Sequence, residues 1–447
     1  MFLLRFIQAR PLAAILTLAA LLRLLAVVAV GDRALVYEFE VLTRNLLDER
    51  GFAYLSETQE GTLVEAYVED PARVFPSAYM PPAYPYFLWA VTSWVGIGTG
   101  GILVVTMLQV VLSVVSCALL YVLGVRLFDR RAALWAALGF ALFPLLILTP
   151  SQISAGSNFI ALLLLFLWLL TRVAVRATEE KEEARGRVLL QYALAGAALG
   201  LVVLSRSQLI AFVPVVWAWL ALLRSPRWLP GAAVLTVACV LVLTPWTLRN
   251  AEALGVATPL ATSGGHNLWQ AYGSQAVGTH ASYAVPPRPL PIDLDLALAS
   301  VPRTDRLEIA RDSVYRAFAL DALQGDPERA ARLGVRKLWL YWVHFGGDDI
   351  NYPGADSPLF WGPWLLLLPL AFFGIVRAAR SDWRRSSFLY LYLLGQTAIV
   401  VAFFVLPRYR LAILPVLLLF AGVALAYVQQ RVSGRAAGPS PPIASRP

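Results

Sequence analysis

Apolar residues occur along this chain in long runs separated by short polar or basic segments, and this pattern predicts a bundle of membrane-spanning helices. A helix needs roughly 20 mainly apolar residues to cross a hydrocarbon core of about 30 Å. We assign spans to residues 11–30, 101–124, 132–149, 157–175, 188–204, 208–224, 229–247, 358–376, 387–405 and 410–428. A shorter apolar piece at 83–97 is interpreted as interfacial, with an eleventh span as the alternative. The predicted fold class is an all-α integral membrane protein.

Two long segments, residues 31–100 and 248–357, interrupt the series of spans. The first begins with apolar positions at helix spacing, which predicts a helix over roughly 36–49. The second contains a glycine-rich stretch, TSGGHNLWQAYG, interpreted as a turn region, and then two amphipathic stretches near 304–323 and 327–345. The predicted organisation is an N-terminal membrane module 1–247, the outer segment 248–357, C-terminal membrane helices 358–428, and a disordered tail 429–447.

Basic residues set the orientation, because short loops rich in Lys and Arg stay on the cytoplasmic side. With both termini inside, the cytoplasmic loops contain most of these cations: Arg126, Arg130, Arg131, Arg172, Arg176, Lys181, Arg185, Arg187, Arg224, Arg227, Arg377, Arg380, Arg384 and Arg385. The two long segments then face the extracytoplasmic side of the cell membrane. The basic, apolar N-terminus is interpreted as a retained first span and not as a removed signal.

The composition agrees with this class: 59% of the residues are hydrophobic and 15% are charged, far from the average of soluble domains. The net charge of +9 does not indicate a nucleic-acid partner, since much of it lies in the cytoplasmic loops, where anionic lipid is the expected partner. Cys117 and Cys239 both fall inside predicted spans, so we expect packing roles and neither a disulfide nor a zinc site.

Several function classes are disfavoured by what the sequence lacks. The second to tenth predicted spans contain no Asp or Glu, whereas coupled transporters usually need intramembrane carboxylates. The chain also has no GxxxxGK[ST] loop, no HExxH helix and no clustered cysteines, which disfavours nucleotide hydrolysis and a structural zinc site. Polar chemistry is therefore expected at the outer surface, because lipid excludes unsatisfied polar groups.

Five separated motifs resemble those of the C superfamily of glycosyltransferases, the group with protein mannosyltransferases and aminoarabinose transferases that use polyprenyl-phosphate sugars. LTRNLLDERGF is similar to the helix after the first span of that group, and AYMPPAYPYFLWA to the signature that closes the same loop. LTPWTLRNAEALG, SGGHNLWQAYGSQAVG and PRYRLAILPVLLLFAG resemble later elements in the same order. The resemblance implies a multi-pass cell-envelope glycosyltransferase with its site on the extracytoplasmic side.

In that family the first outer loop supplies an acidic residue that helps to deprotonate the acceptor, commonly seven residues before the Asn of the loop helix. Counting back from Asn45 gives Glu38 as the implied catalytic base, with Asp32 and Glu40 as alternatives. On a helix Glu38 and Glu40 lie about 200° apart, so at most one faces a site. Many family members have Asp two positions earlier, where this chain has Val36.

Candidate contacts to a donor come from the ends of the predicted spans. Guanidinium groups suit phosphate oxygens, so Arg206 is the leading phosphate contact, followed by arginines at similar depth, Arg249, Arg408 and Arg410. These arginines have an alternative role as interfacial anchors. Sugar contacts are expected from the SGGHNLW stretch, with His266, Asn267 and Trp269 as candidates; the alternative is a tight turn with Trp269 at the membrane interface. The stiff aromatic segment with Tyr79, Tyr84 and Tyr86 is a candidate lining for the prenyl chain of the donor, with a rigid re-entry into the bilayer as the alternative.

No metal ligand is assigned, and no cofactor is certain. A divalent cation stays an alternative, because Asp348 and Asp349 are adjacent carboxylates and the resembling family is mixed in metal dependence. His344 is expected in an interfacial aromatic belt. The predicted function is transfer of a sugar from a polyprenyl-phosphate donor to a lipid, glycan or protein acceptor. The alternatives are a lipid-linked oligosaccharide ligase or polymerase, and a lipid flippase or transporter.

Overall fold

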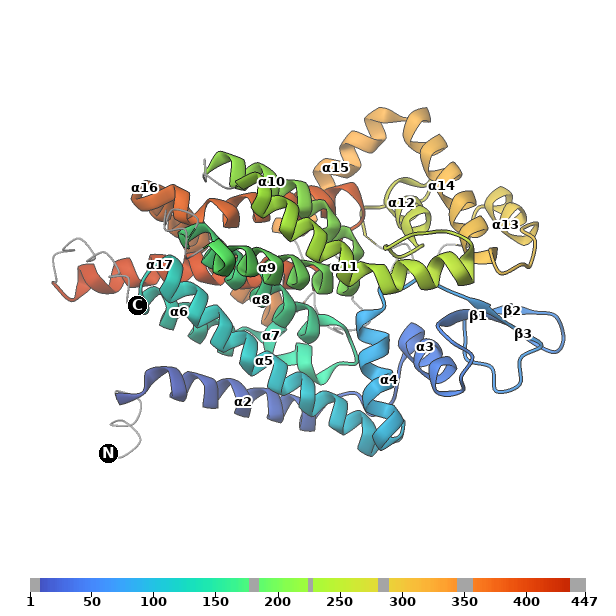
Figure 1. Cartoon of the computed structure of the whole chain (residues 1–447), viewed down its shortest axis with the longest axis horizontal. Coiled ribbons are helices and arrows are strands. Elements are labelled where there is room, and N and C mark those ends of the chain that lie inside the picture. Colours follow the sequence, from blue (N-terminus) through green and yellow to red (C-terminus); the bar gives the residue numbers. More distant parts are fainter. Residues whose placement is uncertain (1–8, 177–184, 224–227, 280–288, 344–356, 435–447) are drawn as a thin grey trace.

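The computed structural model describes residues 9–176, 185–223, 228–279, 289–343 and 357–434. These residues form a helical bundle with the two long segments gathered at one end (Figure 1). The start of the first helix, α2, and the end of the last, α17, lie at the opposite end of the bundle. His344, Asp348, Asp349 and most of the predicted tail lie outside the described residues.

The helices of the bundle are α2 (Pro11–Val30), α5 (Thr99–Leu127), α6 (Arg130–Leu142), α7 (Pro144–Leu148), α8 (Gly156–Arg176), α9 (Arg185–Ser205), α10 (Phe212–Leu222), α11 (Trp228–Leu254), α16 (Pro358–Ala402) and α17 (Leu414–Val432). Short 3₁₀ turns join them: η1 (Thr149–Ser151), η3 (Ser207–Ala211) and η5 (Pro407–Ala412). Helices outside the bundle are α3 (Tyr37–Leu47), α4 (Ala83–Val95), α12 (Gly264–Tyr272), α13 (Ile292–Ala299), α14 (Leu307–Gly325) and α15 (Pro327–Trp342). The strands are β1 (Ala53–Glu57), β2 (Leu63–Val64) and β3 (Arg73–Pro76).

Each of the ten predicted spans contains helical residues, but the helices differ in whether they are long and apolar enough to cross a membrane. Within the described residues, seven helices are long and apolar enough to cross a membrane, or eight if α6 and α7, bent by 63°, make one span. The 45-residue α16 contains two predicted spans and is broken by non-helical backbone at Asp382. The sixth predicted span corresponds to the shorter η3–α10 pair, Ser207–Leu222. An integral membrane class follows from these helices.

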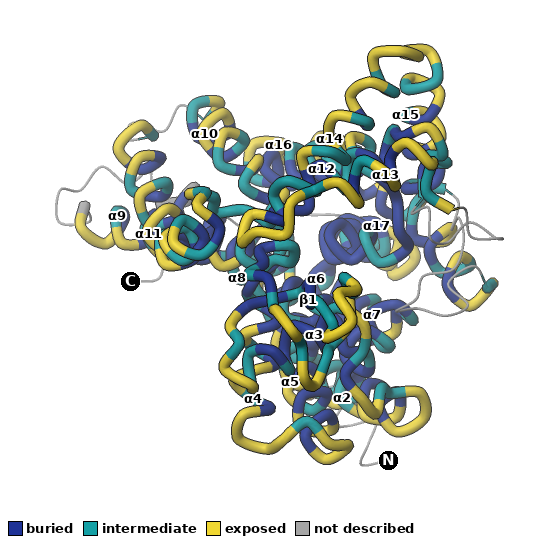
Figure 2. Tube along the Cα trace, turned by 90° about the vertical axis from the view of Figure 1, so that its right-hand side faces the viewer, coloured by how far each residue is buried: buried dark blue, intermediate teal, exposed yellow. Residues whose placement is uncertain are grey.

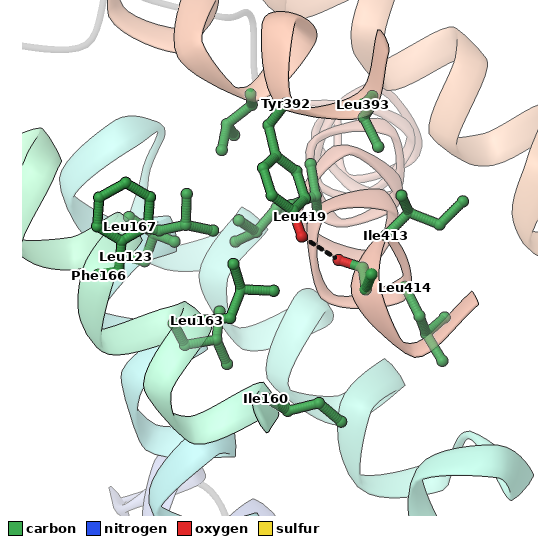
Figure 3. Packing of buried hydrophobic residues seen from close by; sticks show 14 of the residues in the cluster. Leu123, Ile160, Leu163, Phe166, Leu167, Tyr392, Leu393, Ile413, Leu414 and Leu419 are labelled. Carbon is green, nitrogen blue, oxygen red and sulfur yellow. Dashed lines mark hydrogen bonds between the residues drawn. The ribbon is translucent and has the colours of Figure 1, made fainter. Parts of the chain in front are cut away.

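Helix α17 forms the centre of the bundle. Its residues from Leu414 to Gly422 are buried on every side, as expected for a helix surrounded by others (Figure 2). It packs on α6 and on α16, where a Cβ atom at Gly374 would lie 1.8 Å from the carbonyl oxygen of Phe420. Figure 3 shows the surrounding core, in which the Tyr392 hydroxyl donates a hydrogen bond to the carbonyl of Ala412 at 2.9 Å. Close backbone approach through small residues is typical of membrane helices.

Two buried arginines donate hydrogen bonds to backbone carbonyls at the C-terminal ends of helices. Arg23 of α2 donates to the carbonyls of Phe140 and Ala141 at 3.0 and 3.3 Å, at the break between α6 and α7, and its Nε donates to Ser113 Oγ at 2.6 Å. Arg410 donates to the carbonyls of Leu340 and Tyr341 in the last turn of α15, at 2.6 and 2.9 Å. The last carbonyls of a helix have no partner within the helix, and a cation stabilises the negative end of its dipole.

The first outer segment departs from the predicted all-α class. Its helix α3 agrees with the prediction over 36–49, but residues 53–76 form a three-stranded antiparallel sheet in the order β2-β1-β3. Five-residue or shorter strands give little periodic signal, so the sheet was missed. Helix α4 crosses the ends of the bundle helices (Figure 1) and is 13 residues long. At 1.5 Å per residue it reaches about 20 Å, too short to span the membrane alone.

The second outer segment corrects the interpretation of the glycine-rich stretch. TSGGHNLWQAYG is not a turn: residues 264–272 form α12. Its Gly265 packs against α14, where a Cβ atom would meet the Asp312 carbonyl oxygen at 2.0 Å. The two amphipathic stretches form α14 and α15, as predicted. Trp269 lies in a small apolar core with Leu294 and Leu298 of α13.

Lys337 is a buried cation on α15 that contacts the end of α16. Its Nζ lies 3.7 Å from the ring centre of Tyr272 and donates to the carbonyl of Val401 at 3.3 Å. Burial, followed by repulsion from Arg329, lowers the pKa of Lys337 to about 7 from the ordinary 10.5. Between pH 7 and 10.5 the folded protein has therefore released a proton that the unfolded chain still holds, so stability rises with pH across this window.

We expect Lys337→Met to raise the melting temperature at pH 6, where the wild type has the full cost of a buried charge, and to have a much smaller effect at pH 9. Thermal unfolding of the purified protein at both pH values measures the difference. Arg336→Met on the same helix is the control, because Arg336 is exposed. An effect of Lys337→Met that is equal at both pH values would contradict the assigned cause.

Candidate active site

A cavity of about 660 Å³, here called the inner cavity, opens where the outer segments meet the bundle. Its walls come from α3, the segment before α4, the junction of α9 and η3, the start of α12, and the loop after α16. Six residues singled out from the sequence share its lining: Glu38, Tyr79, Arg206, His266, Asn267 and Arg408. These positions are up to 370 residues apart in the chain (38 to 408) and come together only in the fold.

Of the three acidic candidates, Glu38 is the one that lines the inner cavity, and it is half-buried there. The chain turns sharply just before it, because Tyr37 has a φ of 49°, a conformation that non-glycine residues rarely adopt. Such strain often occurs at functional sites. Glu40 points elsewhere and pairs with Arg44, one helical turn on, at 2.9 Å. The two carboxylates thus face different ways, as the helical period requires.

Asp32 holds the exit of α2 against the turn after η1. Its Oδ2 accepts a hydrogen bond from the backbone N–H of Ile153 at 2.6 Å, and its own N–H donates to the carbonyl of Ser151 at 2.9 Å. Burial raises the pKa of Asp32, although the Ile153 hydrogen bond opposes that shift. Asp32 is not among the residues that line the inner cavity.

Arg206 and Arg408 supply the positive charge of the inner cavity. Arg206 occupies the non-helical junction where α9 ends and η3 begins, and Arg408 lies in η5, ahead of α17. The Arg206 guanidinium lies over the Phe159 ring at 4.4 Å and near the Tyr409 ring at 5.8 Å. Stacking of this kind orients the guanidinium plane.

Arg249 and Arg410 have structural contacts away from the inner cavity. Arg249 donates to the carbonyls of Ser77 and Phe52 at 2.5 and 2.7 Å, so it fastens the first outer segment to α11. Arg410 is 1% exposed and caps α15, as described above. Neither lines the cavity. Their positions therefore do not support the predicted role of Arg249 and Arg410 as phosphate contacts.

Tyr79 and His266 form a hydrogen-bonded pair in the cavity wall. The Tyr79 hydroxyl lies 3.1 Å from His266 Nδ1, and the Tyr79 ring stacks on Tyr54 with centroids 5.0 Å apart. Burial raises the pKa of Tyr79, and the negative charges nearby, Glu38 among them, add to this effect. Asn267 lines the cavity one residue on, whereas Trp269 faces the α13–α14 core and is 5% exposed.

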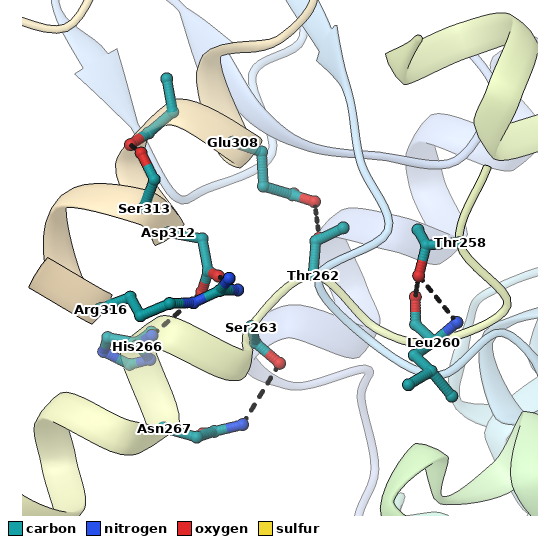
Figure 4. A network of polar contacts seen from close by, with 11 residues as sticks. Thr258, Leu260, Thr262, Ser263, His266, Asn267, Glu308, Asp312, Ser313 and Arg316 are labelled. Carbon is teal, nitrogen blue, oxygen red and sulfur yellow. Dashed lines mark hydrogen bonds and ion pairs between the residues drawn. The ribbon is translucent and has the colours of Figure 1, made fainter. Parts of the chain in front are cut away.

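Helix α14 holds this pair in place with two carboxylates that sequence inspection missed (Figure 4). Glu308 accepts hydrogen bonds from the hydroxyls of Ser77 and Thr262 and, at 2.8 Å, from the N–H of Ala78, the residue before Tyr79. One turn later, Asp312 accepts from the N–H of His266 at 3.0 Å. Their spacing of four puts both on one helix face, and that spacing was the available signal.

The two carboxylates contact different elements: Asp312 binds the first turn of α12, and Glu308 binds the first outer segment. Asp312 caps the N-terminal turn of α12, where Ser263 makes no side-chain cap and the helix dipole favours a negative charge. Glu308 is 5% exposed, and burial raises its pKa against the opposing hydrogen bonds from Ser77, Thr262 and Ala78. Together they join the two walls that hold Tyr79 and His266.

A metal site is not evident in the part of the chain that the structure describes. No group of three or more His, Cys, Asp or Glu side chains comes together there.

A comparison with family models overlaps two of the five motifs, AYMPPAYPYFLWA and the first part of LTPWTLRNAEALG. Residues 79–248 match the model of the dolichyl-phosphate-mannose-protein mannosyltransferase family. The resemblance to the C superfamily is confirmed. The matched range contains Tyr79 and Arg206, and Glu38 lies before it. No curated protein sequence matches the chain.

Solved structures of an archaeal oligosaccharyltransferase share the fold at low identity. The oligosaccharyltransferase of Archaeoglobus fulgidus, tethered with an acceptor peptide, aligns with a TM-score of 0.59 and 13% identity over 96% of this chain and 51% of its own. The same archaeal enzyme, AglB, in complex with an inhibitory peptide and a dolichol-phosphate, gives 0.56 and 13% over 97% and 53%. ArnT from Cupriavidus metallidurans, bound to undecaprenyl phosphate, gives 0.38 and 13% over 94% and 78%. This chain spans about half the length of the archaeal enzyme.

We expect Glu308→Gln to lower sugar transfer at least tenfold, because one amide oxygen cannot accept the bonds of both carboxylate oxygens and Tyr79 then moves. The loss of buried hydrogen bonds should also cost roughly 1–3 kcal/mol of stability. Activity and thermal unfolding of the purified protein measure both effects. Glu328→Gln is the control, since Glu328 is exposed and pairs only on its own helix. Unchanged activity in Glu308→Gln would rule out this positioning role.

Proposed function

We propose that this chain is a membrane glycosyltransferase that transfers a sugar from a polyprenyl-phosphate donor to an acceptor on the extracytoplasmic side. The observation that carries the proposal is the inner cavity, in which one carboxylate, Glu38, shares a space with two guanidinium groups, Arg206 and Arg408. A base and a phosphate-binding cation are the two groups that such a transfer needs. The family match and the shared fold support the assignment.

In the proposed reaction an acceptor oxygen attacks the anomeric carbon of the donor in a single inverting displacement. Glu38 takes the proton of the acceptor hydroxyl as the new carbon–oxygen bond forms. The bond between the anomeric carbon and the phosphate oxygen breaks, and its electron pair leaves with the prenyl phosphate. Arg206 and Arg408 stabilise the phosphate charge, and the positions of Tyr79 and His266 suit contacts to the sugar.

The prenyl chain of the donor is proposed to lie along the apolar part of the same cavity. Ile210 of η3, Ile399 of α16 and Phe403 after α16 line it on the side of the bundle. A chain in that position would join the lipid phase to the phosphate contacts Arg206 and Arg408. The dolichol-phosphate bound by the archaeal enzyme of the same fold supports a lipid phosphate as the ligand class.

We expect Glu38→Gln to reduce transfer by at least 100-fold while the donor still binds, because the amide keeps the shape of Glu38 and cannot take a proton. Arg206→Ala should instead weaken donor binding, because it removes a phosphate contact. Transfer from a radiolabelled polyprenyl-phosphate sugar in proteoliposomes, with donor binding measured separately, distinguishes the two.

Two results would count against this assignment. Normal transfer by Glu38→Gln would remove Glu38 as the base. Loss of transfer in His266→Ala together with full activity in Glu38→Gln would favour the oligosaccharide ligase alternative, in which arginine and histidine carry the reaction. A matched control is Glu40→Gln, since Glu40 pairs with Arg44 and does not line the inner cavity.

The topology proposed with this function has ten spans and cytoplasmic termini. Counting α6 with α7 as one span, the two halves of α16 separately, and η3 with α10 as a short span gives ten. In this arrangement the kink at Asp382 and its neighbouring arginines are cytoplasmic, and the outer segments at the other end of the bundle face outside (Figure 1).

We expect a cysteine at Gln59 to react with a membrane-impermeant maleimide in intact cells, and one at Ala379 to react only after permeabilisation. Both positions are exposed, and the native Cys117 and Cys239 are buried, away from an impermeant reagent. The reverse labelling pattern would mean that the chain is inserted with the opposite orientation.

A further inference from the structure

Two smaller cavities continue outward from the inner cavity. The first, here called the side pocket, has a volume of about 60 Å³ and shares Tyr79 and His266 with the inner cavity. The second, the outer pocket, has about 260 Å³ and shares Leu55, Glu65 and Arg311 with the side pocket. The three cavities thus form a series that leads from Glu38, between the small sheet and helices α13 and α14, to the outside.

Most residues that line the side pocket have a hydrogen-bonding group, and three of them, Tyr54, Tyr79 and Tyr315, also present an aromatic ring. Tyr54 and Tyr315 present phenol hydroxyls, and Glu65, Asp312 and Arg311 present charges. Leu55 is the aliphatic residue among its lining. Such a wall offers donors and acceptors beside aromatic rings, so it suits a ligand such as a sugar, which has polar edges and apolar faces.

The aromatic rings of the side pocket are held in fixed positions. Tyr54 and Tyr79 stack with an interplanar angle of 9°, and Tyr315 contacts His266 edge to face with centroids 4.8 Å apart. Tyr54 donates to Glu65 at 3.4 Å, and Arg311 lies 3.9 Å from Glu65, distances that leave both contacts weak. Hydroxyl groups of a ligand can replace such weak contacts at low cost.

Size and position also fit the hydroxyl-bearing edge of one sugar ring. At about 10–15 Å³ for each water-sized group, a volume of 60 Å³ accommodates about five such groups, which is enough for one edge of a ring, with the rest of the ring in the open mouth of the pocket. A ring here would lie against Tyr79 and His266, the wall shared with the inner cavity. Glu38 acts electrostatically on both Tyr54 and Tyr79, so the proposed base is close to this wall.

We propose that the side pocket and the outer pocket form the acceptor site of this protein and that the acceptor is a carbohydrate, with its terminal sugar in the side pocket. This inference rests on the proposed function, because it assigns the second substrate of the same reaction. The outer pocket is lined by the apolar Leu63, Leu298 and Val301 and by the charged Asp295, Arg303 and Arg311. It would take the next sugar, whose ring faces are apolar and whose edges are polar.

The test is binding of defined probes to the full-length protein in nanodiscs, measured by saturation-transfer NMR and titration. The probes are mannotriose, maltotriose and arabinotriose, with a ten-residue peptide rich in Ser and Thr as the competitor class. We expect at least one trisaccharide to bind and the peptide not to bind. Glu65→Gln and Tyr315→Phe should each weaken that binding at least tenfold while keeping the side-chain shape, because Gln replaces one charged acceptor oxygen by an NH₂ donor and Phe lacks the phenol hydroxyl.

Glu69→Gln is the matched control, since Glu69 is exposed in the same segment and is not among the residues that line either pocket. Failure of all three trisaccharides to bind, binding of the peptide instead, or unaltered binding in Glu65→Gln and Tyr315→Phe would overturn the proposal. Glu38→Gln separates it from the catalytic assignment. If Glu38→Gln binds the trisaccharide and transfers no sugar, both the acceptor site and the catalytic role of Glu38 are supported. If Glu38→Gln binds the trisaccharide and transfers sugar at the normal rate, the catalytic role of Glu38 is wrong and the acceptor site is not affected.

Discussion

Lipid offers no hydrogen bonds, so the backbone N–H and C=O groups at interruptions of the helices need partners from the protein. The architecture of this protein depends on which side chains supply them. The bundle is interrupted at the α6–α7 bend, at the α9–η3 junction and after α16, and each interruption leaves backbone groups that need partners. Arg23 supplies donors at the first of these sites, and Arg410 supplies them to the end of α15 beside the third. A hydrogen bond from a charged donor contributes roughly 1.5–3 kcal/mol, which explains why such cations are buried.

The same interruptions create the inner cavity. Where helices end before reaching the outer segments, side chains from several elements can face a common space, and Arg206 and Arg408 lie at two such ends. Arginine therefore has two roles here that depend only on position. A guanidinium that meets helix carbonyls, as in Arg410, stabilises the fold, and one that meets the cavity brings positive charge to the candidate site.

The two outer segments are joined by exposed arginine pairs, Arg73 with Asp305 and Arg303 with Glu57, and by two carboxylates of α14 that lie deeper. Glu308 and Asp312 of α14 accept hydrogen bonds from residues that flank Tyr79 and from the first turn of α12. Because these walls come from segments about 190 residues apart, 79 to 266, their relative position depends on α14. The inner cavity and the two smaller pockets share those walls, so the proposed donor and acceptor sites are mechanically coupled through one helix.

The sequence by itself determined the membrane class, the positions of the long helices, α3, α14 and α15, and the ordered motifs that carry the family resemblance, because each depends on local periodicity or on neighbouring residues. Tertiary structure alone decided which polar groups share a cavity. Glu38 and Glu40 look alike in sequence, as do Arg206 and Arg249, yet in each pair the first lines the cavity and the second is held by a protein partner. The small sheet, the helical state of α12 and the role of Glu308 were also decided there. Each depends on contacts between segments far apart in the chain, and such contacts leave no period in the sequence.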